Sequence, residues 1–180
     1  MNAKANQNWR KQDMWKWEVN SILYSNFLYN SPKDIFQAVC NELGRYYQSE
    51  KLQYIKSKRE LRWKGSNLRC KLGFWSSHHN KKGEWVNLEI VTSIFAINSS
   101  DMERNGILSF GFRPQSFNVY GIDYGLFNEI TSYIDSTIKR VAELDTKIGL
   151  EKFLLTNQKS VFVGKNPNNY QYLKQLGFDD

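Results

Sequence analysis

Residues 58–75, KRELRWKGSNLRCKLGFW, decide the fold because apolar and charged side chains alternate on both sides of a short turn. Alternation with a period of two is typical of a strand with one buried face. Gly65 and the two polar residues after it supply the turn. The stretch therefore predicts a β-hairpin with one buried and one charged face. The side chains expected to point inward are Leu61, Trp63, Leu68, Cys70, Leu72 and Phe74.

Two further strands are predicted downstream of the hairpin. Residues 85–97, WVNLEIVTSIFAI, are the most β-prone stretch of the chain and are expected to form the central strand. One side of this strand carries Val86, Leu88, Ile90, Thr92 and Ile94. After a polar turn over residues 98–105, Leu108, Phe110 and Phe112 alternate until Pro114 ends the run. Short connections between four such strands predict an antiparallel meander.

Two helices are predicted before the hairpin. Apolar residues recur at the spacing of one helix face between residues 11 and 28, namely Trp15, Val19, Ile22, Leu23 and Phe27. A second helix is expected to run to about residue 48. Its start is marked by Ser31 as a cap, by Pro32 at the first helical position, and by Asp34, whose charge favours the helix dipole.

The longest helix is predicted after the sheet. Asp123 is a candidate N-cap and Gly149 an interruption. A shorter segment over residues 150–155 and a last helix from Pro167 to Gly177 are expected to follow. The apolar stripe of the long helix consists of Phe127, Ile130, Ile134, Ile138, Val141, Leu144 and Ile148.

This order of elements predicts an α+β fold: an antiparallel meander sheet of about four strands with N- and C-terminal helices packed on one face. The chain has 180 residues, enough to bury a core without disulfides or a structural metal. Residues 1–10 are polar and are expected to be flexible. Residues 11–180 show no repeat, low-complexity tract or linker, so we expect a single domain.

Composition favours a cytoplasmic protein. The chain has no apolar run of the length that a membrane span needs, and its N-terminus lacks the apolar run of a signal peptide. Cys40 falls in a helical apolar pattern and Cys70 alternates inward along a strand, so both are expected to be buried thiols. Neither cysteine lies in a recognisable nucleophile motif.

The basic character of the chain is local. The formal net charge is +7, yet residues 51–82 alone contain ten basic side chains and one acidic side chain, Glu60. The period of the hairpin places basic side chains on its outward face, with an aromatic side chain beside them. These candidate partner-binding residues are Lys56, Lys58, Arg62, Lys64, Arg69, Lys71 and Trp75.

Three interpretations compete for this basic face. A nucleic-acid site would set the cations against phosphates and use Trp75 or Tyr54 for stacking. A docking face for an acidic protein would use the same charges for steering. A solvated face, or a charged edge strand that resists pairing, would explain them without a partner. No RNA-binding strand motif, zinc-finger spacing, GXXG loop or helix-turn-helix signature is present.

No catalytic constellation emerges from the sequence. His78 and His79 are the only metal candidates, in a turn without a third ligand spaced nearby. Glu89 is expected to be an ordinary outward strand residue, because the nuclease pattern Glu-x-Lys is missing. An enzyme built around His78, His79, Glu84 or Asp123 is the remaining alternative, but no acid, base and nucleophile converge. We therefore expect no cofactor.

Several short segments resemble small bacterial α+β domains, some of which are immunity proteins of polymorphic toxin systems. The similarity covers most of residues 33–178. The segments are residues 34–39, 54–57, 68–77 with Asn80, 83–86, Asp123, 126–130 and 173–178.

This resemblance implies a non-enzymatic cytoplasmic protein that blocks a toxin by binding it. The basic face departs from the common case of acidic immunity proteins against cationic nucleases. Together with the charge pattern, the resemblance predicts a protein-binding domain whose basic face meets an acidic partner, with a toxin as one candidate. The alternative is a nucleic-acid-binding accessory protein that uses the same face.

Overall fold

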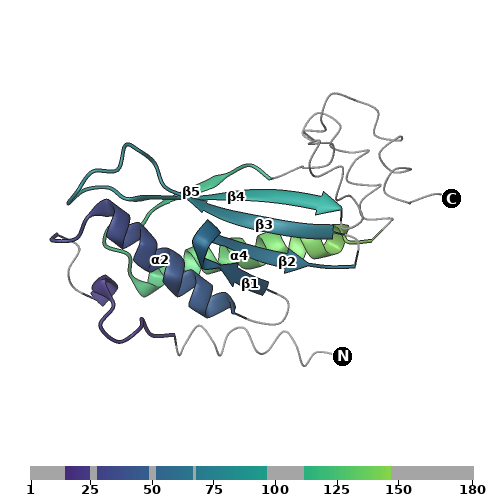
Figure 1. Cartoon of the computed structure of the whole chain (residues 1–180), viewed down its shortest axis with the longest axis horizontal. Coiled ribbons are helices and arrows are strands. Elements are labelled where there is room, and N and C mark those ends of the chain that lie inside the picture. The colour runs from purple at the N-terminus through teal and green to yellow at the C-terminus, as the bar shows by residue number, and fades with distance from the viewer. Residues whose placement is uncertain (1–14, 25–27, 49–51, 67, 97–111, 147–180) are drawn as a thin grey trace.

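A computed structural model describes residues 15–24, 28–48, 52–66, 68–96 and 112–146 (Figure 1). The described part contains two long helices, two short 3₁₀ helices and five strands. In chain order they are η1 (Ile22–Tyr24), α2 (Pro32–Tyr47), β1 (Leu52–Ile55), η2 (Lys56–Lys58), β2 (Glu60–Lys64), β3 (Leu68–Trp75), β4 (Asn87–Ala96), β5 (Gln115–Asn118) and α4 (Tyr124–Leu144).

The strands form one antiparallel sheet in the order β1-β2-β3-β4-β5. The predicted hairpin is confirmed as β2 and β3, with Leu61 opposite Leu72. The predicted count of four strands is low by one, because β1 adds a short edge strand before η2. The expected central position of the fourth strand, β4, is wrong. The middle of the sheet is β3, which pairs along its whole length with β4.

The described part contains a strand after Pro114 that the sequence did not predict. The sequence predicted a run that Pro114 ends, whereas β5 begins at Gln115 and pairs with β4 through Phe117 opposite Leu88. A proline immediately before a strand leaves every N–H of that strand available for pairing. Phe112 precedes β5, and its ring lies 4.1 Å beneath the guanidinium of Arg140 in α4.

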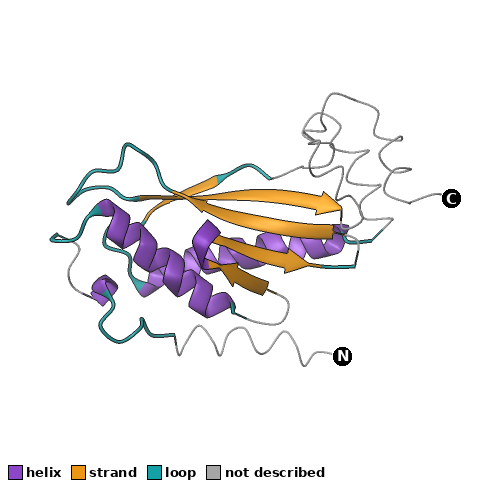
Figure 2. Ribbon diagram, in the orientation of Figure 1, coloured by secondary structure: helices purple, strands orange, loops and turns teal. Residues whose placement is uncertain are grey.

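Both long helices cover the same face of the sheet, as Figure 2 shows below β3 and β4. Alternate residues of β3 are buried on that face, and the buried side of β4 is the predicted one. At Gly44 of α2, a side chain would overlap the ring of Tyr54 in β1, so glycine allows the close approach of helix and strand. The α+β class is confirmed, whereas the predicted helix placement is matched only in part, by α2 and α4.

The predicted helix caps are also confirmed. The Ser31 hydroxyl accepts a hydrogen bond from the Asp34 N–H at 3.2 Å, and Pro32 begins α2. The Asp123 carboxylate accepts one from the Leu126 N–H at 2.8 Å, at the start of α4. Such caps satisfy backbone donors that have no partner inside a helix.

The C-terminal end of α4 is tied to the β2–β3 turn. The Asp145 carboxylate accepts hydrogen bonds from the Ser66 N–H at 2.6 Å and the Leu68 N–H at 2.7 Å. Gly65 sits directly against this carboxylate, where a β-carbon would overlap it. The contact fixes the hairpin relative to the helix that backs it.

The predicted helix over residues 11–28 is wrong for the described residues in that range. Residues 15–21 are irregular, and only the single 3₁₀ turn η1 follows. Asn20 has a φ of 69°, which a continuous α-helix does not allow. Trp17 is buried and Val19 is 83% exposed, so the helical spacing missed one core residue and selected one exposed residue. Leu23, which it also selected, is buried.

Other predictions fall outside the described residues. They concern the flexible segment 1–10, the turn at 98–105, the run 108–111, Ile148 and Gly149, and the segments 150–155 and 166–177. Within the described part, neither long helix has the length and apolar character that crossing a lipid bilayer requires.

Candidate interaction surface on the outer sheet face

The sheet face opposite the helices carries its side chains in cross-strand rows. The register places Lys64 beside Arg69 and Phe95 in one row. The next row contains Arg62 and Lys71, with Gln53 and Ser93 on either side. The row after that contains Ile55, Glu60, Gly73 and Val91. Positive charge is therefore concentrated at the end of the face where β3 begins.

We call Arg62, Lys64, Arg69 and Lys71 the outer cation cluster. Lys64 stands directly opposite Arg69, and Arg62 opposite Lys71. Like charges directly across a sheet are destabilising, so this arrangement needs compensation.

Two neighbours supply that compensation. The Glu60 carboxylate pairs with the Arg62 guanidinium at 2.5 Å, and Glu60 is only 14% exposed at its side chain. The Lys71 ammonium lies 4.4 Å from the centre of the Phe95 ring. A cation over an aromatic face contributes about 0.5–1 kcal/mol at an exposed site.

Trp75 lies on the outer face but away from the cation cluster. It is 62% exposed and stands opposite Glu89 of β4. Its indole nitrogen lies 2.8 Å from the position that a β-carbon on Gly73 would occupy, so the ring covers this glycine. It is four positions after Lys71 on β3, which corresponds to a rise of about 13 Å along the strand. Trp75 and the cations therefore form separate parts of one face.

Two predicted members of the basic face are placed elsewhere. Lys56 and Lys58 lie in η2, a turn between β1 and β2, and are exposed. The strand alternation begins only at Glu60, because Arg59 has a φ of 51° and breaks the period. Tyr54, named as a stacking candidate, is also wrong: it packs against the core side of the sheet.

The β3–β4 loop holds the two histidines. Their rings lie 3.8 Å apart, and both side chains are exposed. Over the described residues, no three His, Cys, Asp or Glu side chains come together as a metal site would require. The loop is instead held by hydrogen bonds: the Asn80 amide donates to Ser76 Oγ at 2.6 Å, and Asn80 Oδ1 accepts from the Asn87 N–H at 2.7 Å.

Both cysteines are buried free thiols, as predicted. Burial raises the pKa of Cys70 to about 12. Burial also raises the pKa of Cys40, although the charge of nearby Arg59 acts in the opposite direction. Because the thiolate is the reactive form, neither thiol is an activated nucleophile.

Two of the carboxylates considered for catalysis stabilise local structure. Asp123 caps α4, and Glu84 pairs with Lys81 at 2.6 Å in the β3–β4 loop. Glu89 is an outward residue of β4, as predicted.

Sequence reasoning missed two features of the outer face. Phe95 was part of the predicted β4 stretch but was not recognised as the platform under Lys71. Glu60 was counted only as the single acid among ten bases, although its place two residues before Arg62 on a strand already predicts a shared face. Both signals follow from the strand period.

No family model, curated protein or solved structure was found to match the chain. The function is therefore inferred from the geometry of the chain itself.

Proposed function

We propose that the chain is a non-catalytic protein-binding domain whose outer cation cluster docks an acidic protein. The observation that carries the proposal is the pairing of Lys64 with Arg69 and of Arg62 with Lys71 across β2 and β3. Together with Glu60, the four cations leave a formal net charge of +3 on two adjacent strands. These charges attract an acidic partner and steer its approach.

The mixed chemistry of the face favours a protein partner over a nucleic acid. Nucleic-acid sites for single strands combine a positively charged groove with aromatic rings on which bases stack. Here Glu60 occupies the row next to the cluster, Phe95 lies under Lys71, and Trp75 is beside Glu89. Aromatic side chains and arginine are enriched at protein interfaces, and this face carries both.

The resemblance to immunity domains suggests a toxin as the partner class. The same proposal includes a cytoplasmic location. An immunity protein acts by occupying its toxin, so it needs complementarity and no catalytic group. A toxin gene beside the gene for this chain would supply the natural partner. Co-expression with that toxin is expected to protect cells, and reversal of the outer cluster to abolish protection.

The direct test compares two charge-reversal variants of equal net charge. One is Lys64→Glu with Lys71→Glu, on the outer face, and the matched control is Lys56→Glu with Lys58→Glu, in η2. The probes are poly-L-glutamate and single-stranded and double-stranded DNA, each titrated at several salt concentrations. We expect the outer-face variant to bind poly-L-glutamate at least about tenfold more weakly than the control, because close pairs of opposite charge at an interface couple by about 1.5 kcal/mol or more.

Two results would contradict the proposal. Equal loss in both variants would mean that binding follows net charge alone and not the outer face. DNA binding stronger than polyglutamate binding, falling steeply with salt and lost only in the outer-face variant, would establish the nucleic-acid alternative.

A further inference from the structure

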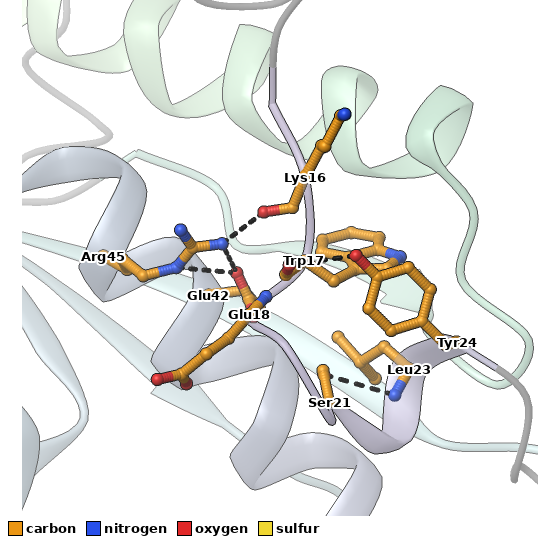
Figure 3. A network of polar contacts seen from close by, with 8 residues as sticks. All are labelled: Lys16, Trp17, Glu18, Ser21, Leu23, Tyr24, Glu42 and Arg45. Atoms are coloured by element: carbon orange, nitrogen blue, oxygen red, sulfur yellow. Dashed lines mark hydrogen bonds and ion pairs between the residues drawn. The ribbon is translucent and has the colours of Figure 1, made fainter.

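Residues 15–24 form an N-terminal strap that lies against both long helices (Figure 3). The strap has no strand pairing, and its only regular structure is η1. We call the residues that hold it the strap site. They are Glu42, Arg45 and Tyr46 of α2, and Tyr124 and Phe127 of α4.

Two side chains of α2 hold the strap by its backbone. Glu42 is buried, with 3% exposure, and accepts a hydrogen bond from the Glu18 N–H at 2.8 Å. Arg45 pairs with the second Glu42 oxygen at 2.6 Å and also donates to the Lys16 carbonyl oxygen (Figure 3). Every peptide offers such N–H and C=O groups. The pair therefore recognises an extended backbone and not a particular side chain at either position.

Two tryptophans set the register of the strap. Trp17 is 5% exposed, stacks on Tyr124 at 4.9 Å between ring centroids, and meets Phe127 edge-on at 4.9 Å. Trp15 stacks on Phe127 at 5.8 Å and meets Tyr46 edge-on at 5.0 Å. The strap site thus binds one aromatic ring on each side of Lys16, whose carbonyl oxygen accepts a hydrogen bond from Arg45.

The fit of the strap is incomplete. The indole nitrogen of Trp15 and the hydroxyl of Tyr46 are buried, and neither finds a hydrogen-bond partner among the described residues. Burial raises the pKa of Tyr46, so its hydroxyl keeps its proton as a donor. An unsatisfied buried polar group costs about 1–3 kcal/mol. A ligand with an acceptor oxygen at this point would be held more tightly than the strap.

Beyond Glu18 the strap bonds to itself. The Ser21 N–H donates to the Glu18 carbonyl at 2.9 Å, and the Tyr24 hydroxyl donates to the Trp17 carbonyl at 3.0 Å. Val19 points into solvent. Release of the strap therefore breaks no strand pairing or α-helical hydrogen bond of the described fold. Its cost is the exposure of Trp17 and Leu23, which are buried in the core.

We propose that the strap site is a peptide-binding site that the strap occupies in the free protein. Its ligand is an extended segment of a partner protein with two aromatic side chains two residues apart and an acceptor near the first ring. Such a segment displaces the strap and takes over its contacts with Glu42 and Arg45. This site lies on the helical side of the sheet and is independent of the outer cation cluster.

The test uses the full chain with its strap weakened by Trp15→Ala and Trp17→Ala. The probe is a fluorescent peptide with the sequence of residues 15–24, WKWEVNSILY, and the control peptide has alanine at both tryptophan positions. We expect the variant to bind the probe saturably and the control peptide at least about tenfold more weakly. Wild type should also bind the probe at least about tenfold more weakly than the variant, because its own strap competes at high effective concentration. A folded variant that binds neither peptide would overturn the proposal.

Hydrogen exchange of the wild type tests the same point without a variant. If the strap opens locally, the Glu18 amide should exchange at least about a hundredfold faster than the amides of β3. Equal protection at Glu18 and in β3 would mean that the strap leaves only on global unfolding, and would overturn the proposal. A wild-type dimer that the double variant cannot form would assign the site to the strap of a second copy, and would overturn assignment to a partner.

Discussion

The two faces of β3 share one backbone and one set of ladder hydrogen bonds, yet they differ in almost every other respect. Leu68, Cys70, Leu72 and Phe74 point into a core in which each is at most 3% exposed. The alternate residues carry two cations, a glycine and an exposed tryptophan. Stability comes from the buried face, because apolar burial contributes most of the folding free energy. On the outer face of β3, Trp75 is exposed, whereas Arg69, Lys71 and Gly73 are half-buried.

The largest expected difference between the faces is in packing. Leu72→Ala should lower the free energy of unfolding by about 2–5 kcal/mol, because it leaves a cavity at a residue with no exposed surface. Lys71→Ala, one residue away, should cost less than about 1 kcal/mol, since it removes contacts on the outer face, among them the one with the Phe95 ring. Urea unfolding of both variants measures the contrast. Equal losses would show that the outer face is part of the core.

The buried thiol of Cys70 on β3 should make the stability of the protein depend on pH in the alkaline range. Its pKa is about 12 in the folded protein, against an ordinary value of 9.0, because of burial. As the pH rises, the unfolded chain loses this proton before the folded protein does. The contribution of the neutral thiol to the free energy of unfolding is therefore complete below pH 9 and is lost as the pH rises toward 12. Between about pH 9 and pH 11, wild type should lose about 1.4 kcal/mol per pH unit more than Cys70→Ala. Parallel pH profiles of the two proteins would contradict a buried neutral thiol.

Loss of a buried polar contact between the helices should lower the free energy of unfolding less than loss of a core side chain and more than loss of a surface charge. The Tyr47 hydroxyl donates at 2.8 Å to the Thr131 carbonyl and lies 2.9 Å from Asp135 Oδ1. Burial, and next the charge of Asp135, raise the pKa of Tyr47. Tyr47→Phe should destabilise the protein by about 1–2 kcal/mol, measured by thermal unfolding. An unchanged midpoint would mean that this hydroxyl does not link α2 to α4.

The smallest expected effect is that of the acid on the outer face. Glu60→Gln removes the counterion of Arg62 and should change the free energy of unfolding by less than about 1 kcal/mol. Binding of poly-L-glutamate should strengthen by a factor of about two to five, because Arg62 is released and one repulsive charge is lost. Weaker binding after this change would show that Glu60 positions Arg62 for the partner and does not compete with it.

The sequence was most informative where local chemistry and periodicity agree. Strand alternation predicted the hairpin and its buried residues, and the capping residues Ser31 and Asp123 predicted where both long helices begin. These signals are local, since a cap or a strand period is complete within a few residues.

Prediction from the sequence failed where residues far away in the chain determine the local backbone conformation. The strap contains Trp15 and Ile22 at helical spacing, yet Glu42 and Arg45, more than twenty residues away, hold its backbone in an irregular path. The edge strands β1 and β5 have four residues each, too few for a period to be recognised. The left-handed backbone conformation of Arg59 places Lys56 and Lys58 off the basic face, and no sequence pattern predicts this conformation.

The central claim is that the outer face, and not net charge, binds an acidic partner. Amide chemical-shift mapping during a titration with poly-L-glutamate tests it residue by residue. We predict shifts concentrated on Arg62, Lys64, Arg69, Lys71 and Phe95, with η2 and the strap unchanged. Shifts spread over all lysines, or centred on Lys56 and Lys58, would contradict the claim.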